Sequence, residues 1–266
     1  MGSMMEGPIK AGAADRLHVA MQGRAQGSDA LAQLIAGGSI SPDVFMPVTT
    51  TPMNTILKAG KATIAYPIAR TEMVIAYSPK SKFAQQFADS GKRGAMPWWQ
   101  VLEQPGLRFG RTDPITDPQG RNIIFTMQLA ARYYRRPELV QVLGETINPA
   151  QIFSEPTVGA RLQSGELDAA SAYRIQPGPF NLPYVLLPLE INLGSDKLRD
   201  RYATASLSLN GKTYHPESLI YYASVLTSSM HKDQATAFVR WLQGDGQRIF
   251  QQYFYDSATD AAPLRA

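Results

Sequence analysis

The residues best suited to ligand chemistry lie in one short segment, Gly-Arg-Thr-Asp-Pro-Ile-Thr-Asp-Pro-Gln-Gly at positions 110–120. Asp117 followed by Pro118 is typical of a helix start, because aspartate caps exposed backbone N–H groups and proline fits the first helical turn. The amides of Gln119 and Gly120 come next. Two interpretations are compatible: Asp117 caps the helix, or the amides donate to an anion that Gly120 allows to approach closely.

Helix starts beside polar loops recur along the chain and predict an anion site. One helix is expected to begin at Ser28, a second at Pro118 and a third near Thr157. A helix start carries unpaired N–H groups and about half a positive charge. Several of them converging on one place would hold a dianion without any lysine or arginine.

The charged residues of the segment allow other interpretations. Arg111 and Asp113 are near enough in sequence to pair across the turn and stiffen it, with Pro114 fixing the backbone. Asp113 and Asp117 together could indicate a cation site, but two carboxylates in one turn are too few for it. We therefore expect a scaffold role for the Arg111–Asp113 pair.

Most enzyme chemistry is poorly supported by the residue types present. The chain has no cysteine, which excludes thiol catalysis, thiolate metal sites and disulfides. Its three histidines are isolated, and neither a Gly-x-Ser-x-Gly nucleophile motif nor a Gly-x-x-x-x-Gly-Lys-Ser/Thr phosphate loop is present. We expect a binding protein without a cofactor, rather than a hydrolase or transferase acting on a phosphorylated small molecule.

Charge and hydropathy argue against two further classes of protein. The net charge is +4, and the 26 lysines and arginines are spread along the chain, so a nucleic-acid-binding stripe is not indicated. No apolar stretch approaches the roughly 18 residues that cross a bilayer. The first 15 residues lack the charged start and apolar run of a secretory signal, so we expect an exported form to have lost its signal.

Short apolar strands alternate with amphipathic helices, which is the pattern of an α/β fold. The chain has 266 residues, more than one core usually holds, and this length favours two lobes. Strands are expected at 17–21, 44–48, 73–77, 107–110, 167–173, 184–189 and 219–226. Helices are expected at 29–35, 98–102, 118–134, 157–163, 233–242 and 246–253.

The segment at 110–120 resembles the Gly-Arg-(Ser/Thr)-Asp-Pro-x-x-Asp-Pro-x-Gly stretch of the molybdate/tungstate-binding proteins of ABC importers. Other parts of the chain follow in the order found in that family, and the resemblance extends from about Ser28 to Tyr255. These parts are Gln26-Gly27-Ser28 before a helix, Thr71–Tyr77, Arg161–Asp168, Ala235–Val239 and Gly246–Phe250.

The resemblance implies an α/β fold of the type II periplasmic-binding-protein kind. Such a fold has two lobes, a double-crossover hinge and a ligand cleft between the lobes. The first lobe would combine residues 1–70 with 190–266, and the second would hold residues 75–185. The crossovers would lie near 70–78 and 184–192.

The resemblance also implies a set of neutral donors for the ligand. Matched position by position, Ser28 gives a hydroxyl and an amide, and Tyr173 gives its phenol. Gln119 and the helix start at Glu155 give backbone amides. Neutral dipoles hold an anion without the desolvation cost of a buried ion pair. A further family serine, found after the first strand in an Ala-Gly-Ser context, has only Ser3 as a counterpart here, at a different spacing.

Asp117 is also matched, and a carboxylate beside a dianion should repel it. Either Asp117 caps its own helix, or it bonds the metal centre of molybdate or tungstate, which the sulfur of sulfate does not allow. The glutamate that accompanies this aspartate in the archaeal branch of the family is replaced here by Ala172. That replacement favours the cap.

The expected function is that of an extracytoplasmic solute-binding protein that captures molybdate or tungstate for an ABC transporter, without catalysis. Its partners would be the small oxyanion and a membrane permease, and not nucleic acid. The protein would be a monomer in the periplasm or outside the cell. Two alternatives share the fold: a sulfate-binding protein, and the ligand-sensing domain of a regulator.

Overall fold

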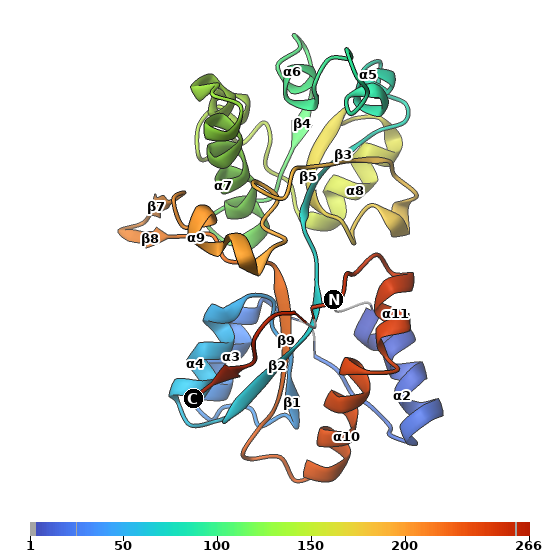
Figure 1. Cartoon of the computed structure of the whole chain (residues 1–266), viewed down its shortest axis with the longest axis vertical. Coiled ribbons are helices and arrows are strands. Elements are labelled where there is room, and N and C mark those ends of the chain that lie inside the picture. The colour runs from blue at the N-terminus through green and yellow to red at the C-terminus, as the bar shows by residue number, and fades with distance from the viewer. Residues whose placement is uncertain (1–3, 25, 259) are drawn as a thin grey trace. The chain divides into compact units, whose positions relative to one another are not determined.

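The computed structural model describes residues 4–24, 26–258 and 260–266 (Figure 1). The chain forms two compact units, which we call the first unit (Met1–Arg70 with Leu219–Ala266) and the second unit (Thr71–Ser218). It therefore passes between the units twice, at 70/71 and at 218/219. Within the described ranges no helix is both long and apolar enough to span a membrane.

The first unit is built on a four-stranded antiparallel sheet. Its strands are β1 (Val44–Phe45), β2 (Ile64–Arg70), β9 (Ile220–Val225) and β10 (Leu264–Arg265), in the order β1-β9-β2-β10. The two central strands, β9 and β2, come from distant parts of the sequence. Met53, Ile56 and Tyr222 are buried together against this sheet, so both segments contribute to one core.

Helices cover the sheet of the first unit on two sides. Figure 1 shows α3 and α4 beside one face, and α2, α10 and α11 beside the other. The helices of this unit are η1 (Met5–Ile9), α2 (Lys10–Leu17), α3 (Ser28–Ala36), α4 (Thr50–Lys58), α10 (Lys232–Gln243) and α11 (Gln247–Gln252).

The strand expected at 17–21 is wrong. Helix α2 continues to Leu17, and His18 ends it in the left-handed conformation with φ 57°. The alanine-rich sequence before Leu17 favours a helix. Gly12 lets this helix approach α11 closely, since a Cβ at position 12 would lie 2.8 Å from Cδ1 of Ile249. Helix propensity and packing therefore outweigh the short apolar run.

The second unit has a mixed four-stranded sheet in the order β4-β5-β3-β6. The strands are β3 (Met73–Tyr77), β4 (Phe109–Gly110), β5 (Ala169–Tyr173) and β6 (Tyr184–Leu186). Strand β5 is parallel to β4 and antiparallel to β3. Figure 1 shows α7 (Pro118–Tyr133) and α8 (Glu155–Ser164) on opposite sides of this sheet. The α8 side is apolar, with Leu162, Ala170 and Ala172 in one buried cluster.

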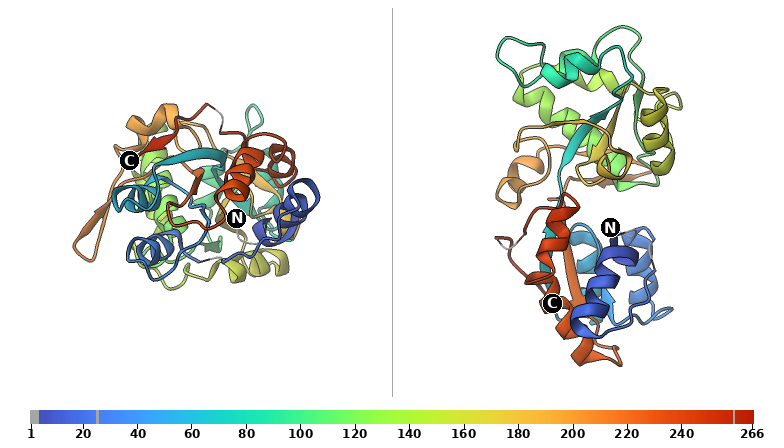
Figure 2. Two further views of the ribbon diagram at one scale, coloured as in Figure 1. Left: turned by 90° about the horizontal axis from the view of Figure 1, so that it is seen from below. Right: turned by 90° about the vertical axis from the view of Figure 1, so that its right-hand side faces the viewer.

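Short helices and a hairpin complete the second unit. The hairpin of β7 (Leu207–Leu209) and β8 (Lys212–Tyr214) is a separate two-stranded sheet that extends away from the main one (Figures 1 and 2). The helices are α5 (Ala84–Asp89), α6 (Trp98–Leu102), η2 (Pro137–Leu143), η3 (Gly178–Phe180), η4 (Asp196–Leu198) and α9 (Arg199–Tyr202).

The boundary of the units differs from the expected one, because residues 190–218 belong to the second unit and not to the first. Asn192 accepts a hydrogen bond from the amide of Met73 (2.7 Å), and its side chain donates to Glu72 (2.5 Å). Further along, Ser206 and Gln128 of α7 exchange two hydrogen bonds of 2.9 and 3.1 Å. Ile191, Leu193 and Tyr202 of this segment are also buried, but an apolar residue in the sequence does not show which of the two units it packs in.

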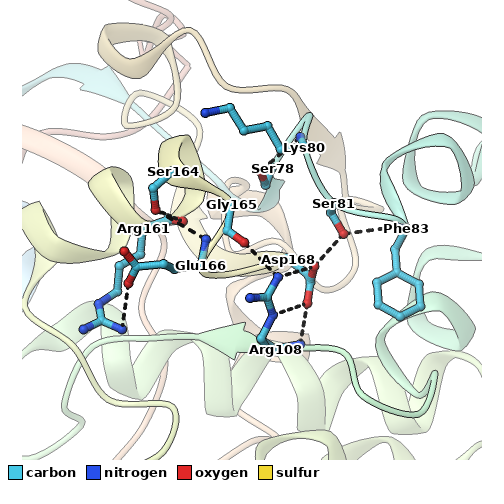
Figure 3. A network of polar contacts seen from close by, with 10 residues as sticks. All are labelled: Ser78, Lys80, Ser81, Phe83, Arg108, Arg161, Ser164, Gly165, Glu166 and Asp168. Carbon is cyan, nitrogen blue, oxygen red and sulfur yellow. Dashed lines mark hydrogen bonds and ion pairs between the residues drawn. The ribbon is translucent and has the colours of Figure 1, made fainter.

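A buried carboxylate joins the starts of the two parallel strands of the second unit (Figure 3). Asp168, only 2% exposed, precedes β5 and accepts three bonds of 2.9–3.0 Å from the side chain and backbone of Arg108, which precedes β4. Ser81 donates a fourth, at 2.7 Å. Burial alone would raise the pKa of Asp168, but the hydrogen bonds from Arg108 and Ser81 outweigh it and hold the pKa below its ordinary value.

Candidate functional site

The start of α7 is closed by its own cap. Asp117 is the N-cap residue in an extended conformation (φ −126°, ψ 124°), and its Oδ1 accepts from the amide of Gln119 at 2.9 Å. The amide of Gly120 donates to the carbonyl of Asp117 at 3.1 Å. The cap predicted for Asp117 is confirmed. Both amides considered as anion donors are thus engaged within the chain, and anion binding by Gln119 would require the carboxylate to turn away.

Gly120 is required by the packing of the loop before α7. A Cβ at this position would lie 2.4 Å from the carbonyl oxygen of Thr112 and 2.7 Å from backbone atoms of Asp113 and Pro114. Backbone atoms cannot give way as a flexible side chain can. The proline-containing turn at 112–114 therefore packs directly on the helix that follows it.

The side chain of Gln119 ties α7 to the end of β5. Its Nε2 donates to the carbonyl of Ser171 at 3.0 Å, and its Oε1 accepts from Gln176 at 2.8 Å. The Oε1 of Gln176 in turn accepts from the amide of Tyr173 at 2.6 Å. Gln119 was expected to act through its backbone. In the structure its buried side chain also stabilises the turn after β5 through these hydrogen bonds.

Tyr173 is the last residue of β5, and only 8% of it is exposed. Asn122 of α7 donates from Nδ2 to the phenolic oxygen of Tyr173 at 2.9 Å. Because an amide nitrogen can only donate, the phenol accepts here and its own hydrogen is directed away from Asn122. Asn122 was missed by the sequence analysis, although it lies three residues after Gln119, on the same face of α7.

The start of α8 lies on the other side of the sheet. The helix begins at Glu155, as expected, and no side chain caps it. The N-cap residue Ser154 instead bonds the hydroxyl of Thr157 at 2.7 Å. Because Pro156 has no N–H group, the backbone donors of the first turn are the amides of Glu155 and Thr157.

Ser28 belongs to the first unit, where it is the first residue of α3. The N-cap position is Gly27, so no side chain caps this helix start either. The first intrahelical bond runs from the amide of Leu31 to the carbonyl of Gly27 at 3.1 Å, which leaves the amides before Leu31 to other partners. Ser28 itself is half-buried.

The predicted site residues thus fall into three places. Asp117, Gln119 and Tyr173 share one polar seam between α7 and β5, the start of α8 lies across the sheet from them, and Ser28 lies in the first unit. Ser3 lies outside the described residues. Over the ranges that the structure covers, no three His, Asp or Glu side chains gather as a metal site.

Comparison with known proteins gives a consistent family. The profile of a family described as bacterial extracellular solute-binding protein matches residues 10–256. An uncharacterized solute-binding protein of Petrotoga mobilis is 30% identical over 192 residues, covering 69% of this chain and 58% of that protein. The molybdate/tungstate-binding protein WtpA of Pyrococcus abyssi is 28% identical over 214 residues, covering 72% and 61%. The chain thus spans about 60% of the length of these curated relatives.

Solved structures agree on the fold. The substrate-binding domain of a molybdenum ABC transporter from Clostridium difficile superposes with a TM-score of 0.63 at 16% identity, covering 96% of this chain and 94% of that one. The periplasmic molybdate-binding protein of Azotobacter vinelandii gives 0.60 at 16% identity, covering 95% and 94%. The type II periplasmic-binding-protein fold expected from the sequence is confirmed.

Proposed function

This chain belongs to the family of bacterial extracellular solute-binding proteins, and from that premise we propose that it captures molybdate or tungstate outside the cytoplasm for the membrane permease of an ABC transporter. Relatives named as molybdate/tungstate-binding support the choice of ligand. In this proposal the protein is a monomer that binds its ligand and does not transform it chemically.

The observation that carries the proposal is the match of residues 10–256 to the solute-binding family. The starts of α3 and α8, like those of the other described helices except α7, have no side-chain cap, and the choice of these two follows from the resemblance to the molybdate/tungstate-binding proteins. An uncapped start offers its amides and the positive end of the helix dipole to an anion. We propose that Ser28 in the first unit, and the amide of Glu155 with the phenol of Tyr173 in the second, donate to the oxyanion.

Asp117 and Gln119 join this set only if the cap opens. In the described state Asp117 occupies the amide of Gln119, so we propose an exchange in which the anion takes that amide. The carboxylate would then face the metal centre of molybdate or tungstate. The closed cap also supports a second candidate, sulfate, because sulfate needs no carboxylate ligand and a capped Asp117 gives no preference for the heavier anions.

A ligand screen by thermal shift tests the function. A ligand that binds only the folded protein stabilises it by about 2.7 kcal/mol at a concentration of 100 times its dissociation constant. We expect molybdate and tungstate to raise the melting temperature, with sulfate weaker and phosphate without effect. Stabilisation by sulfate alone would select the second candidate, and stabilisation by none of the four would overturn the proposal.

Removing one hydroxyl tests the place of Tyr173 in the site. Tyr173→Phe is expected to weaken oxyanion binding by about 1 kcal/mol, roughly fivefold in the dissociation constant, because a buried donor is lost. Calorimetric titration measures the change. Tyr184→Phe, in β6 of the same sheet, is the matched control and should bind as the unmodified protein does. Equal affinity of Tyr173→Phe and the control would remove Tyr173 from the site.

A further inference from the structure

Among the residues whose burial the structure describes, the largest fully buried side chain is that of a cation, Arg111. It follows β4 directly and is 0% exposed. The hydrogen-bonded ion pair expected with Asp113 is not found among the described residues, and Oδ1 of Asp113 instead accepts from the amide of Ile115 at 2.8 Å. The guanidinium instead donates Nη2 to the carbonyls of Glu145 and Thr146, each at 2.9 Å.

Arg111 therefore keeps its charge without a bonded carboxylate. Nε donates to the side-chain oxygen of Gln151 at 3.2 Å, and Nη1 has no partner among the described residues. Burial lowers the pKa of Arg111, against the raising effect of the charge of Asp113, but an arginine stays protonated. A charge surrounded by neutral dipoles in a low-dielectric interior acts over a longer range than a charge in water.

Arg111 lies between the segments that lead into the starts of α7 and α8. The backbone of Arg111 donates to the carbonyl of Gln151 (2.8 Å) and accepts from the amide of Phe153 (3.0 Å), in the segment that leads into α8. The chain after Arg111 leads into α7. Gly110 pairs with Ala170 in the parallel register, so Arg111 stands at the next position along, two residues before the level of Tyr173.

We propose that Arg111 is a positioning residue that also acts as a fixed remote charge, favouring doubly charged over singly charged tetrahedral anions without touching them. The inference rests on the proposed function. Its side chain fixes the approach to α8, and its charge is part of the potential that the anion meets at the start of that helix. A solvent-exposed arginine in the same unit would be screened by water and salt and could not do the same.

The test compares two anions of the same tetrahedral shape and different charge, molybdate (−2) and perrhenate (−1). Calorimetric titration gives the ratio of their affinities for the unmodified protein and for Arg111→Met, which keeps much of the volume and removes the charge. We expect this ratio to fall by about tenfold in the variant. Arg161→Gln is the matched control, because it removes one cation from the exposed surface of α8 and should leave the ratio unchanged.

If Arg111 has a purely structural role, Arg111→Met should weaken the binding of both anions equally and leave the ratio of their affinities unchanged. That result would overturn the inference, while the proposed function would stand. Failure of the unmodified protein to bind either anion overturns the function first. If Arg111→Met does not fold, as judged by circular dichroism, Arg111→Lys, which keeps the charge, and Arg111→Gln, which removes it, are compared instead. The molybdate-to-perrhenate ratio should be retained in Arg111→Lys and fall in Arg111→Gln, and equal ratios in the two variants would overturn the inference.

Discussion

Gly120→Ala is expected to destabilise the second unit by about 3 kcal/mol. Intrinsic helix propensity predicts the opposite sign, since alanine is about 1 kcal/mol more favourable than glycine within a helix. The new methyl group, however, would lie 2.4 Å from the carbonyl oxygen of Thr112. Relief requires the loop at 112–114 to move away from α7, because no flexible side chain is involved.

Differential scanning calorimetry measures this effect. A loss of about 3 kcal/mol corresponds to a fall in melting temperature of roughly 6–12 °C for a protein of this size. Gly91→Ala is the matched control, since Gly91 lies in an exposed turn of the same unit, has no left-handed φ, and a Cβ there meets nothing within 4 Å. We expect the control to melt at the same temperature or slightly higher. A Gly120→Ala protein as stable as the control would show that the loop yields easily.

Asp168→Asn is expected to cost about 3 kcal/mol of unfolding free energy, the lower end of the range for breaking a buried ion pair, because Arg108 is half exposed and can be solvated. Both carboxylate oxygens accept N–H groups of Arg108. An asparagine in either orientation places its NH2 group against one of these donors. Asp89→Asn removes an exposed ion pair with Lys92 and should change stability little. A deficit in Asp168→Asn no larger than in this control would remove Asp168 from the stabilising contacts.

The same carboxylate predicts a pH dependence. Because the folded-state pKa of Asp168 is held below its ordinary value, its stabilising contribution is complete above the unfolded-state pKa of about 4. The contribution is lost as the pH falls through the lower, folded-state pKa. The difference in stability between the unmodified protein and Asp168→Asn should therefore be constant near neutral pH and shrink below about pH 4. A difference unchanged into strong acid would contradict this linkage.

Strongly periodic segments are predicted well from the sequence. The helix expected at 98–102 has the bounds of α6, and those expected at 118–134 and 233–242 agree with α7 and α10 to within a residue. The buried strands at 73–77 and 219–226 are also found as β3 and β9. In each case a continuous or 3.6-residue apolar pattern coincides with the buried face.

Elements whose local signals conflict with their tertiary setting are missed. Strand β2 contains Pro67, which argues against a strand interior, and the register shifts between Pro67 and Ala69 to accommodate it. Helix α4 begins with a threonine-rich, proline-containing run, although its buried residues Met53, Ile56 and Leu57 have helical spacing. That spacing was a usable signal for α4, whereas β2 becomes recognisable only beside its partner strand.

The candidate site divides in the same way. The helix starts at Ser28 and Pro118 and the cap at Asp117 were predicted from local rules, whereas α8 begins at Glu155, two residues before the start near Thr157 that its local pattern indicated. The tertiary contacts around the site cannot be predicted from the local sequence. Asn122 meets Tyr173 only because α7 crosses β5, and Arg111 finds the carbonyls of Glu145 and Thr146 more than thirty residues away.

The origin of the two central strands of the first unit sets an order of assembly. The whole second unit is encoded between β2 and β9. The ribosome therefore synthesises all of the second unit before β9. The amino-terminal part of the first unit cannot complete its sheet until residue 225 at the end of β9 has emerged. The second unit can therefore fold during synthesis. The first unit completes its sheet last, because its strand β9 comes from the carboxy-terminal part of the chain.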